Sequence, residues 1–85
     1  MNTAAALEAV ERVLNRGGER EQVLRAVLEV LHARGVPYAA VRLDDRELTV
    51  GSAIETRTTR GAVTMAVDDV EFVQRVATLI SPYAR

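Results

Sequence analysis

The chain has 85 residues, the size of one small domain, and its formal net charge of −1 gives no general attraction to nucleic acid or to acidic membranes. The absence of cysteine excludes disulfide bonds, thiolate metal sites, cysteine nucleophiles and thioether-linked chromophores. No apolar run follows a basic N-terminal flank, so neither a signal peptide nor a membrane span is expected, and the predicted location is the cytoplasm.

Two amphipathic helices are predicted in the first part of the chain. Residues 4–16 carry apolar side chains at helical spacing on one face, namely Leu7, Val10, Val13 and Leu14. Two glycines at 17–18 end this helix, because glycine favours backbone conformations that a helix does not use. A second helix begins near Glu19. Gly35 is well placed as its left-handed C-cap, and Pro37 prevents its continuation.

Two hairpins are predicted to follow. Their four strands are short stretches rich in alternating apolar and β-branched residues, at 38–43, 47–50, 54–59 and 62–67. Polar residues at 44–46 form the first turn, and Arg60 with Gly61 forms the second. The inward rows of the first and last strands are the most apolar of the four.

The last helix is predicted from Asp68 to about Tyr83. Asp68 and Glu71 have the spacing of a capping box, in which a short acceptor starts the helix and a carboxylate reaches back. Its apolar residues fall in two adjacent rows that span an arc of roughly 180°. One side of this arc is expected to meet the sheet, and the other to meet a second helix from this chain or from another copy.

The order helix, helix, hairpin, hairpin, helix predicts an α+β domain with its helices on one face of an antiparallel sheet. The second helix leading through Gly35-Val36-Pro37 into YAAVRLDDRELTVG, with the closing strand and VEFVQRVATLISPYA, resembles the GAF domain. It is most similar to the small single-domain GAF-like proteins of bacteria, over about residues 7–83. The resemblance implies a single minimal GAF-like domain at 1–85, with a GAF/profilin-like sheet of about four strands, N-terminal and C-terminal helices on one face, and the first and last strands adjacent at the centre.

One departure from the family bears on ligand binding. Larger GAF domains insert helices and loops between the second strand and the final hairpin, and these wall the ligand pocket, whereas only residues 51–53 fill that gap here. Small-molecule sites need about 300–1,000 Å³ of enclosed volume. No residues match the acidic and polar motif of the cyclic-nucleotide-binding members. The resemblance therefore implies the fold, and no cofactor is predicted.

No catalytic constellation is visible, so the chain is not expected to be an enzyme. His32 is the only histidine, and within one helical turn only Glu29 could join it as a metal ligand, which is too few for a site. The acidic clusters at 44–47 and 68–71 lack the glycine and the twelfth-position glutamate of an EF-hand loop. Turn formation and helix capping explain both clusters, and no metal site is predicted.

Four arginines lie near the expected strand ends, together with an aromatic residue: Arg42, Arg46, Arg57, Arg60 and Tyr38. A basic face with aromatic side chains is what single-stranded nucleic-acid binders use. Aromatic residues make up only 4% of the chain, however, and Glu47 and Glu55 lie among the arginines. A solvated strand face with cross-strand ion pairs is the favoured interpretation, and nucleic-acid binding ranks third among the functional hypotheses.

The leading hypothesis is a non-catalytic GAF-like interaction or regulatory module that forms a homodimer or docks on a signalling partner. The alternative is a small-molecule sensor with a shallow or dimer-formed pocket. Dimerisation is expected because three amphipathic helices offer more apolar surface than one sheet face covers. The candidate dimer interface is formed by Leu7, Val10, Leu14 and Val30. In the competing arrangement the first helix folds back over the last and covers this surface within one chain.

Overall fold

The computed structural model describes residues 1–52 and 56–84. They form three helices and four strands, which are α1 (Thr3–Arg16), α2 (Arg20–Ala33), β1 (Tyr38–Arg42), β2 (Glu47–Gly51), β3 (Thr58–Arg60), β4 (Val63–Met65) and α3 (Val70–Ile80). The predicted α+β class and the order of elements are therefore confirmed. No helix in the described part of the chain is both long enough and apolar enough to cross a membrane.

The strands form one antiparallel sheet in the order β2-β1-β4-β3. The expectation that the first and last strands are central neighbours is confirmed. Ala39 and Val41 of β1 lie opposite Val50 and Leu48 on one side, and opposite Met65 and Val63 on the other. All of these side chains except Val50 are fully buried, so the inward rows of the central pair are the sheet's contribution to the core.

The second hairpin is shorter than predicted. The third strand, expected at 54–59, begins only at Thr58, and the part of that prediction at 54–55 lies outside the described residues. The fourth strand, expected at 62–67, is limited to Val63–Met65. Beyond the ladder the Thr58 hydroxyl donates to the Val67 carbonyl over 2.6 Å, so a side-chain bond replaces the next step of strand pairing.

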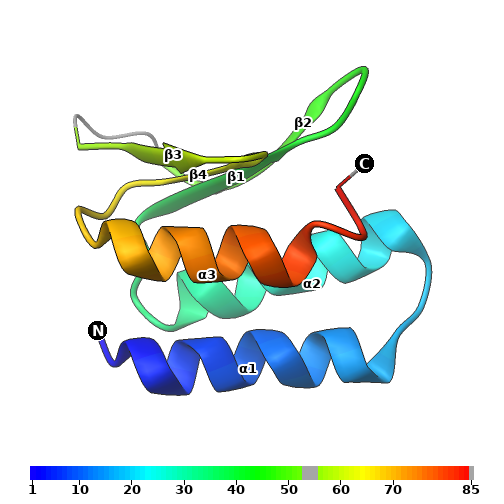
Figure 1. Cartoon of the computed structure of the whole chain (residues 1–85), viewed down its shortest axis with the longest axis horizontal. Helices are drawn as coiled ribbons and strands as arrows, with labels where there is room; N and C mark the ends of the chain where they lie inside the picture. Colours follow the sequence, from blue (N-terminus) through cyan, green and yellow to red (C-terminus); the bar gives the residue numbers. More distant parts are fainter. Residues whose placement is uncertain (53–55, 85) are drawn as a thin grey trace.

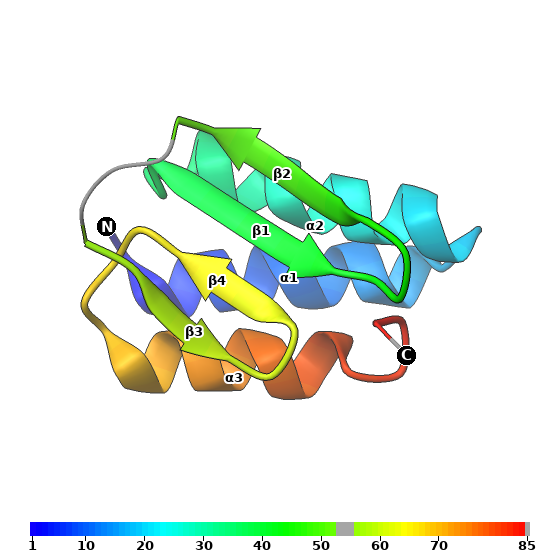
Figure 2. The same cartoon turned by 90° about the horizontal axis from the view of Figure 1, so that it is seen from above.

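All three helices lie on the same side of the sheet, as Figure 1 shows. α2 and α3 contact the strands directly, whereas α1 packs against α2 and α3 on the side away from the sheet. Seen from above, the other face of the sheet carries no helix (Figure 2). The first helix therefore folds back within the chain, as in the competing arrangement considered for its apolar face.

The core is continuous from the sheet to α1. Its largest fully buried side chains are Phe72, Leu24, Leu31, Met65 and Ile80, which come from α3, α2 and β4. Val10 of α1 is also completely buried. Among the described residues, only Met1 and Val70 are large hydrophobic side chains that remain exposed. The apolar arcs of the helices are thus covered largely inside one copy of the chain.

The end of α2 follows the sequence prediction. Gly35 has a φ of +107°, its N–H donates to the His32 carbonyl, and the Val36 N–H donates to the Leu31 carbonyl, both over 3.1 Å. These two bonds form a Schellman motif with Gly35 at the position that favours glycine. Val36 is fully buried, so the cap also directs the chain into β1.

Phe72 and His32 provide a matched pair for core energetics. Phe72 is 2% exposed, so Phe72→Ala should lower the free energy of unfolding by about 3–5 kcal/mol through lost burial and the cavity left behind. His32 is exposed, and its Nδ1–H donates to the Val36 carbonyl over 2.9 Å, so His32→Ala should cost about 1 kcal/mol or less. Urea denaturation measures both values. The reverse order would contradict the placement of both residues.

Gly51 tests a steric constraint on the first hairpin. It ends β2 with a φ of +79°, and a Cβ there would lie 2.0 Å from the Pro37 carbonyl oxygen. Gly51→Ala should therefore cost roughly 2–4 kcal/mol, since the new methyl group must displace backbone. At Gly17, with a φ of +68°, a Cβ meets nothing within 4 Å. Gly17→Ala should cost about 1–3 kcal/mol, because its φ of +68° and ψ of −162° lie in a region that essentially only glycine adopts. Equal losses in thermal unfolding would exclude the Pro37 contact as the cause.

Candidate functional site

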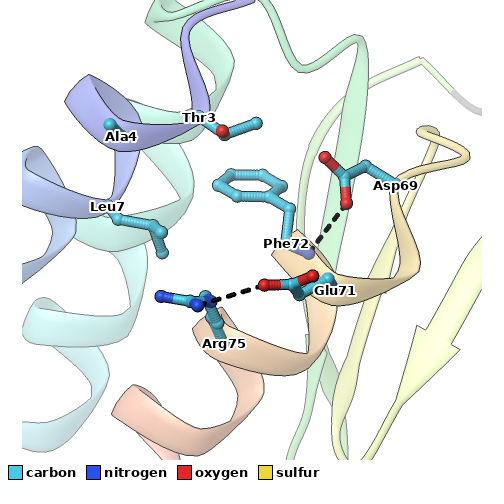
Figure 3. Close-up of a pocket in the computed structure, with 7 residues that line it drawn as sticks. All are labelled: Thr3, Ala4, Leu7, Asp69, Glu71, Phe72 and Arg75. Atoms are coloured by element: carbon cyan, nitrogen blue, oxygen red, sulfur yellow. Dashed lines mark hydrogen bonds and ion pairs between the residues drawn. The ribbon is translucent and has the colours of Figure 1, made fainter.

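A groove runs between α1 and α3 and consists of two adjoining hollows. The first, of about 330 Å³, is lined by Thr3, Ala4, Leu7, Asp69, Glu71, Phe72 and Arg75 (Figure 3). The second, of about 290 Å³, is lined by Leu7, Glu11, Gln74, Arg75, Thr78 and Leu79. The two hollows share Leu7 and Arg75, so they form one continuous surface, called here the α1/α3 groove.

Helical spacing places the side chains that line this groove. Phe72, Arg75 and Leu79 lie three and four residues apart on α3 and therefore share one flank of that helix. Leu7 and Glu11 are related in the same way on α1. The Phe72 ring lies between the two helices (Figure 3). It is almost completely buried, while Leu7 and Leu79 are half-buried. The groove therefore has an apolar floor.

The polar groups at the first hollow bind one another. Oδ1 of Asp69 accepts the Phe72 N–H over 3.0 Å, and the Arg75 guanidinium lies 3.0 Å from a Glu71 carboxylate oxygen (Figure 3). The Arg75 and Glu71 side chains are 63% and 76% exposed, so this ion pair is a weak surface contact. Each of these two carboxylates therefore already has a structural partner.

The predicted capping residue of the last helix is wrong by one position, and the helix is shorter than predicted at both ends. The helix begins at Val70, and the residue that caps it is Asp69 rather than Asp68. Asp69 has extended backbone angles (φ −82°, ψ 90°) that bring its carboxylate onto the amide of Phe72, three residues ahead. The capping-box prediction for Glu71 does not describe its hydrogen bond either, because Glu71 pairs forward with Arg75 across one helical turn.

The four residues of the candidate dimer interface do not share one surface. Leu7 lies in the α1/α3 groove, whereas Val30 lines a different hollow, between α1 and α2. Val10 is 0% exposed and belongs to the core. Leu14 is half-buried, two helical turns from Leu7 on the same side of α1. A single helical contact through all four residues would require α1 to leave its place. Self-association itself stays a prediction.

Three of the four arginines considered for nucleic-acid binding, namely Arg46, Arg57 and Arg60, have side-chain contacts within the chain. Arg46 pairs with Glu21 of α2, which also lies 3.2 Å from Arg25. The Arg57 guanidinium lies 5.3 Å from the centroid of the Tyr38 ring, and Arg60 donates to the Thr59 carbonyl over 2.8 Å. The Glu21–Arg46 pair joins α2 to the first hairpin turn. Sequence reasoning placed ion pairs within the sheet and missed this one, because its partners are 25 positions apart in the sequence.

Three further features of the described surface concern metal binding and the face of the sheet away from the helices. No group of three or more potential metal-ligating side chains is present among residues 1–52 and 56–84. The face of the sheet away from the helices carries a row of small side chains, one from each strand, of which Ala40 is fully buried: Thr49, Ala40, Thr64 and Thr59. The Thr59 and Thr64 hydroxyl oxygens lie 2.9 Å apart.

No protein-family model, curated protein or solved structure was found to match this chain. The α1/α3 groove and the surfaces of the sheet are therefore the features of the molecule that bear on its function.

The corrected cap of α3 gives a direct test. Asp69→Ala removes the acceptor for the Phe72 amide and should lower stability by about 1 kcal/mol. Asp68→Ala removes the same charge one residue earlier, outside the helix, and should change stability by less than about 0.5 kcal/mol. Chemical denaturation of both variants separates the cap from a general charge effect. A larger loss for Asp68→Ala would restore the original capping assignment.

Proposed function

We propose that this chain is a non-catalytic, GAF-like interaction or regulatory module that works by binding protein, either a partner or a second copy. The order of its elements and the central pairing of β1 with β4 support the GAF-like part of the proposal. The observation that supports protein binding is the α1/α3 groove, which is apolar at its floor and polar at its rim.

The geometry of this groove suits an amphipathic helix. Two parallel walls are formed by α1 and α3, and the apolar floor between them is formed by Leu7, Phe72 and Leu79. Peptide helices are commonly recognised in this way, with apolar anchors three or four residues apart inserted between two helices of the receptor. A catalytic role has less support, because Asp69 and Glu71 at the groove already bind a backbone amide and an arginine.

The charges at the rim indicate which segment would bind. The two hollows present the carboxylates of Glu11, Asp69 and Glu71 against the single guanidinium of Arg75, which leaves a formal excess of two negative charges. Complementary charge favours encounter and fixes orientation. We therefore expect the bound segment to be an amphipathic helix with lysine or arginine beside its apolar anchors.

A small-molecule sensor is the second candidate, favoured by the first hollow, whose volume of about 330 Å³ reaches the lower end of the range for ligand sites. A thermal-shift screen with nucleotides and metabolites tests this alternative. A ligand at 100 times its Kd should stabilise the protein by about 2.7 kcal/mol. Stabilisation that Ala4→Phe abolishes, by filling the first hollow, would favour the sensor over the protein-binding module.

Selection of helical peptides from a displayed library tests the protein-binding proposal. We expect the peptides that bind the wild-type chain to be basic and amphipathic, and to lose binding to Leu79→Asp, which places a charge in the groove floor. Val70→Asp is the matched control, since Val70 lies on the same helix, is 43% exposed and does not line the groove.

Circular dichroism establishes that both variants are folded before binding is compared. Peptides that bind Leu79→Asp as tightly as wild type would place the binding surface elsewhere. A library that yields no binding peptide at all would contradict the proposal.

A further inference from the structure

The two edges of the sheet are unequal. β2 and β3 are the edge strands, with five and three residues respectively. β3 lies beside α3. Because the other residues of this strand bond to β4, only Thr59 has backbone N–H and C=O groups that point to the open edge. β2 is the longer edge and is the one on which a further strand could pair.

Hydrogen bonds at the two ends of the first hairpin show which groups of β2 face outward. The Leu43 N–H donates to the Arg46 carbonyl over 2.7 Å, and the Ser52 N–H donates to the Pro37 carbonyl over 3.2 Å. Bonded pairs alternate along an antiparallel ladder, so residues 46, 48, 50 and 52 are the ones that pair with β1. The backbone N–H and C=O groups of Glu47, Thr49 and Gly51 therefore point to the open edge.

This edge lacks most of the features that block strand addition. β2 contains no proline and no lysine, and Glu47 is its only charged residue. Leu48 is buried against the helices and Val50 is half-buried, so the inward side of the strand is fixed and its register is set. A strand that joins here meets a rigid template of three outward-facing residues.

A second copy of β2 fits this template in one register better than in others. With a two-fold axis at Thr49, Thr49 lies opposite its own copy and Glu47 lies opposite Gly51, so all three outward residues are paired. An axis at Glu47 would place two carboxylates directly opposite each other, which is destabilising. The axis at Thr49 instead pairs two threonines, a favourable cross-strand contact.

The flank of α2 beneath this edge is also complementary to itself. Glu21 pairs with Arg46 at the turn end of β2, and the His32 ring lies against Gly51 at its other end. The midpoint between Glu21 and His32 on α2 therefore lies near the level of Thr49. A two-fold axis at that level brings Arg25 of one copy toward Glu29 of the other, and both side chains are exposed. Their opposite charges favour the antiparallel approach of the two helices.

From these observations we infer that the chain forms a two-fold homodimer in which two β2 strands pair antiparallel about Thr49 and join the two sheets into one. The occupant of the β2 edge is a second copy of this chain. The inference rests on the proposed role as a protein-binding module and deepens it, because it names the surface at which the copies meet. That surface is separate from the α1/α3 groove.

Thiol cross-linking tests the register directly. The chain has no cysteine, so Thr49→Cys introduces a single thiol. In a hydrogen-bonded antiparallel pair the two Cα atoms are about 5.5 Å apart, which lies within the range for a disulfide. Under mild oxidation Thr49→Cys should give a covalent dimer on a non-reducing gel. Glu47→Cys is the matched control on the same strand, because its two copies would be roughly 13 Å apart, four residues at the rise of a strand.

Sedimentation velocity supplies the second measurement. At micromolar concentration we expect wild type and Thr49→Val to sediment with twice the mass of one chain. Thr49→Pro should sediment as a monomer, because proline removes the outward N–H without removing a bond to β1. If Thr49→Pro does not fold, the amounts of covalent dimer formed by the two cysteine variants decide whether the inferred pairing holds.

A wild-type chain that stays monomeric at every concentration would overturn the inference, and so would equal cross-linking of Thr49→Cys and Glu47→Cys. A monomer that still binds peptides in the α1/α3 groove would leave the proposed function intact. A dimer that binds no peptide would contradict the proposed role of the α1/α3 groove and would leave the inferred β2 contact in place.

Discussion

The packing of α1 across α2 and α3 is the interaction on which the rest of this fold depends. A domain of this length buries only about 60–65% of the surface of its unfolded chain, so little core can be lost. α2 and α3 are apolar on two sides, one toward the sheet and the other away from it. α1 covers the second side with Val10 and Val13, both buried. Without α1 the sheet and two helices would expose much of their core, so this helix completes the domain.

The parts of the fold that sequence reasoning predicted are those with local causes. Gly35 ends α2 through its own positive φ and the two hydrogen bonds around it, which depend little on the rest of the chain. The central place of β1 and β4 follows from their apolar inward rows. The position of α1 could not be derived, because the same apolar face fits a fold-back or a second copy equally well. The capping residue of α3 was displaced by one position, since Asp68 and Asp69 are both good acceptors and only tertiary packing chooses between them.

The candidate site was only partly visible in the sequence, for the same reason. Helical spacing placed Leu7 in a predicted dimer interface, but it did not predict that Phe72 and Leu79 of the last helix would line a groove together with it. A groove is a relation between two elements, and periodicity describes each element alone. The ion pair of Glu21 with Arg46 likewise depends on where the first hairpin turn lies over α2. The outward-facing backbone groups of β2 could be assigned only from the hydrogen bonds between β1 and β2.

The contact between Gly51 and the Pro37 carbonyl also bears on how other members of this fold would be recognised. Apolar periodicity in helices and strands is common to every sheet covered by helices on one face, so it discriminates poorly between folds. A backbone atom that occupies the space of a missing side chain acts at one position and allows one residue type. Sequences that share this architecture should therefore agree at that glycine, even where their core residues have exchanged freely.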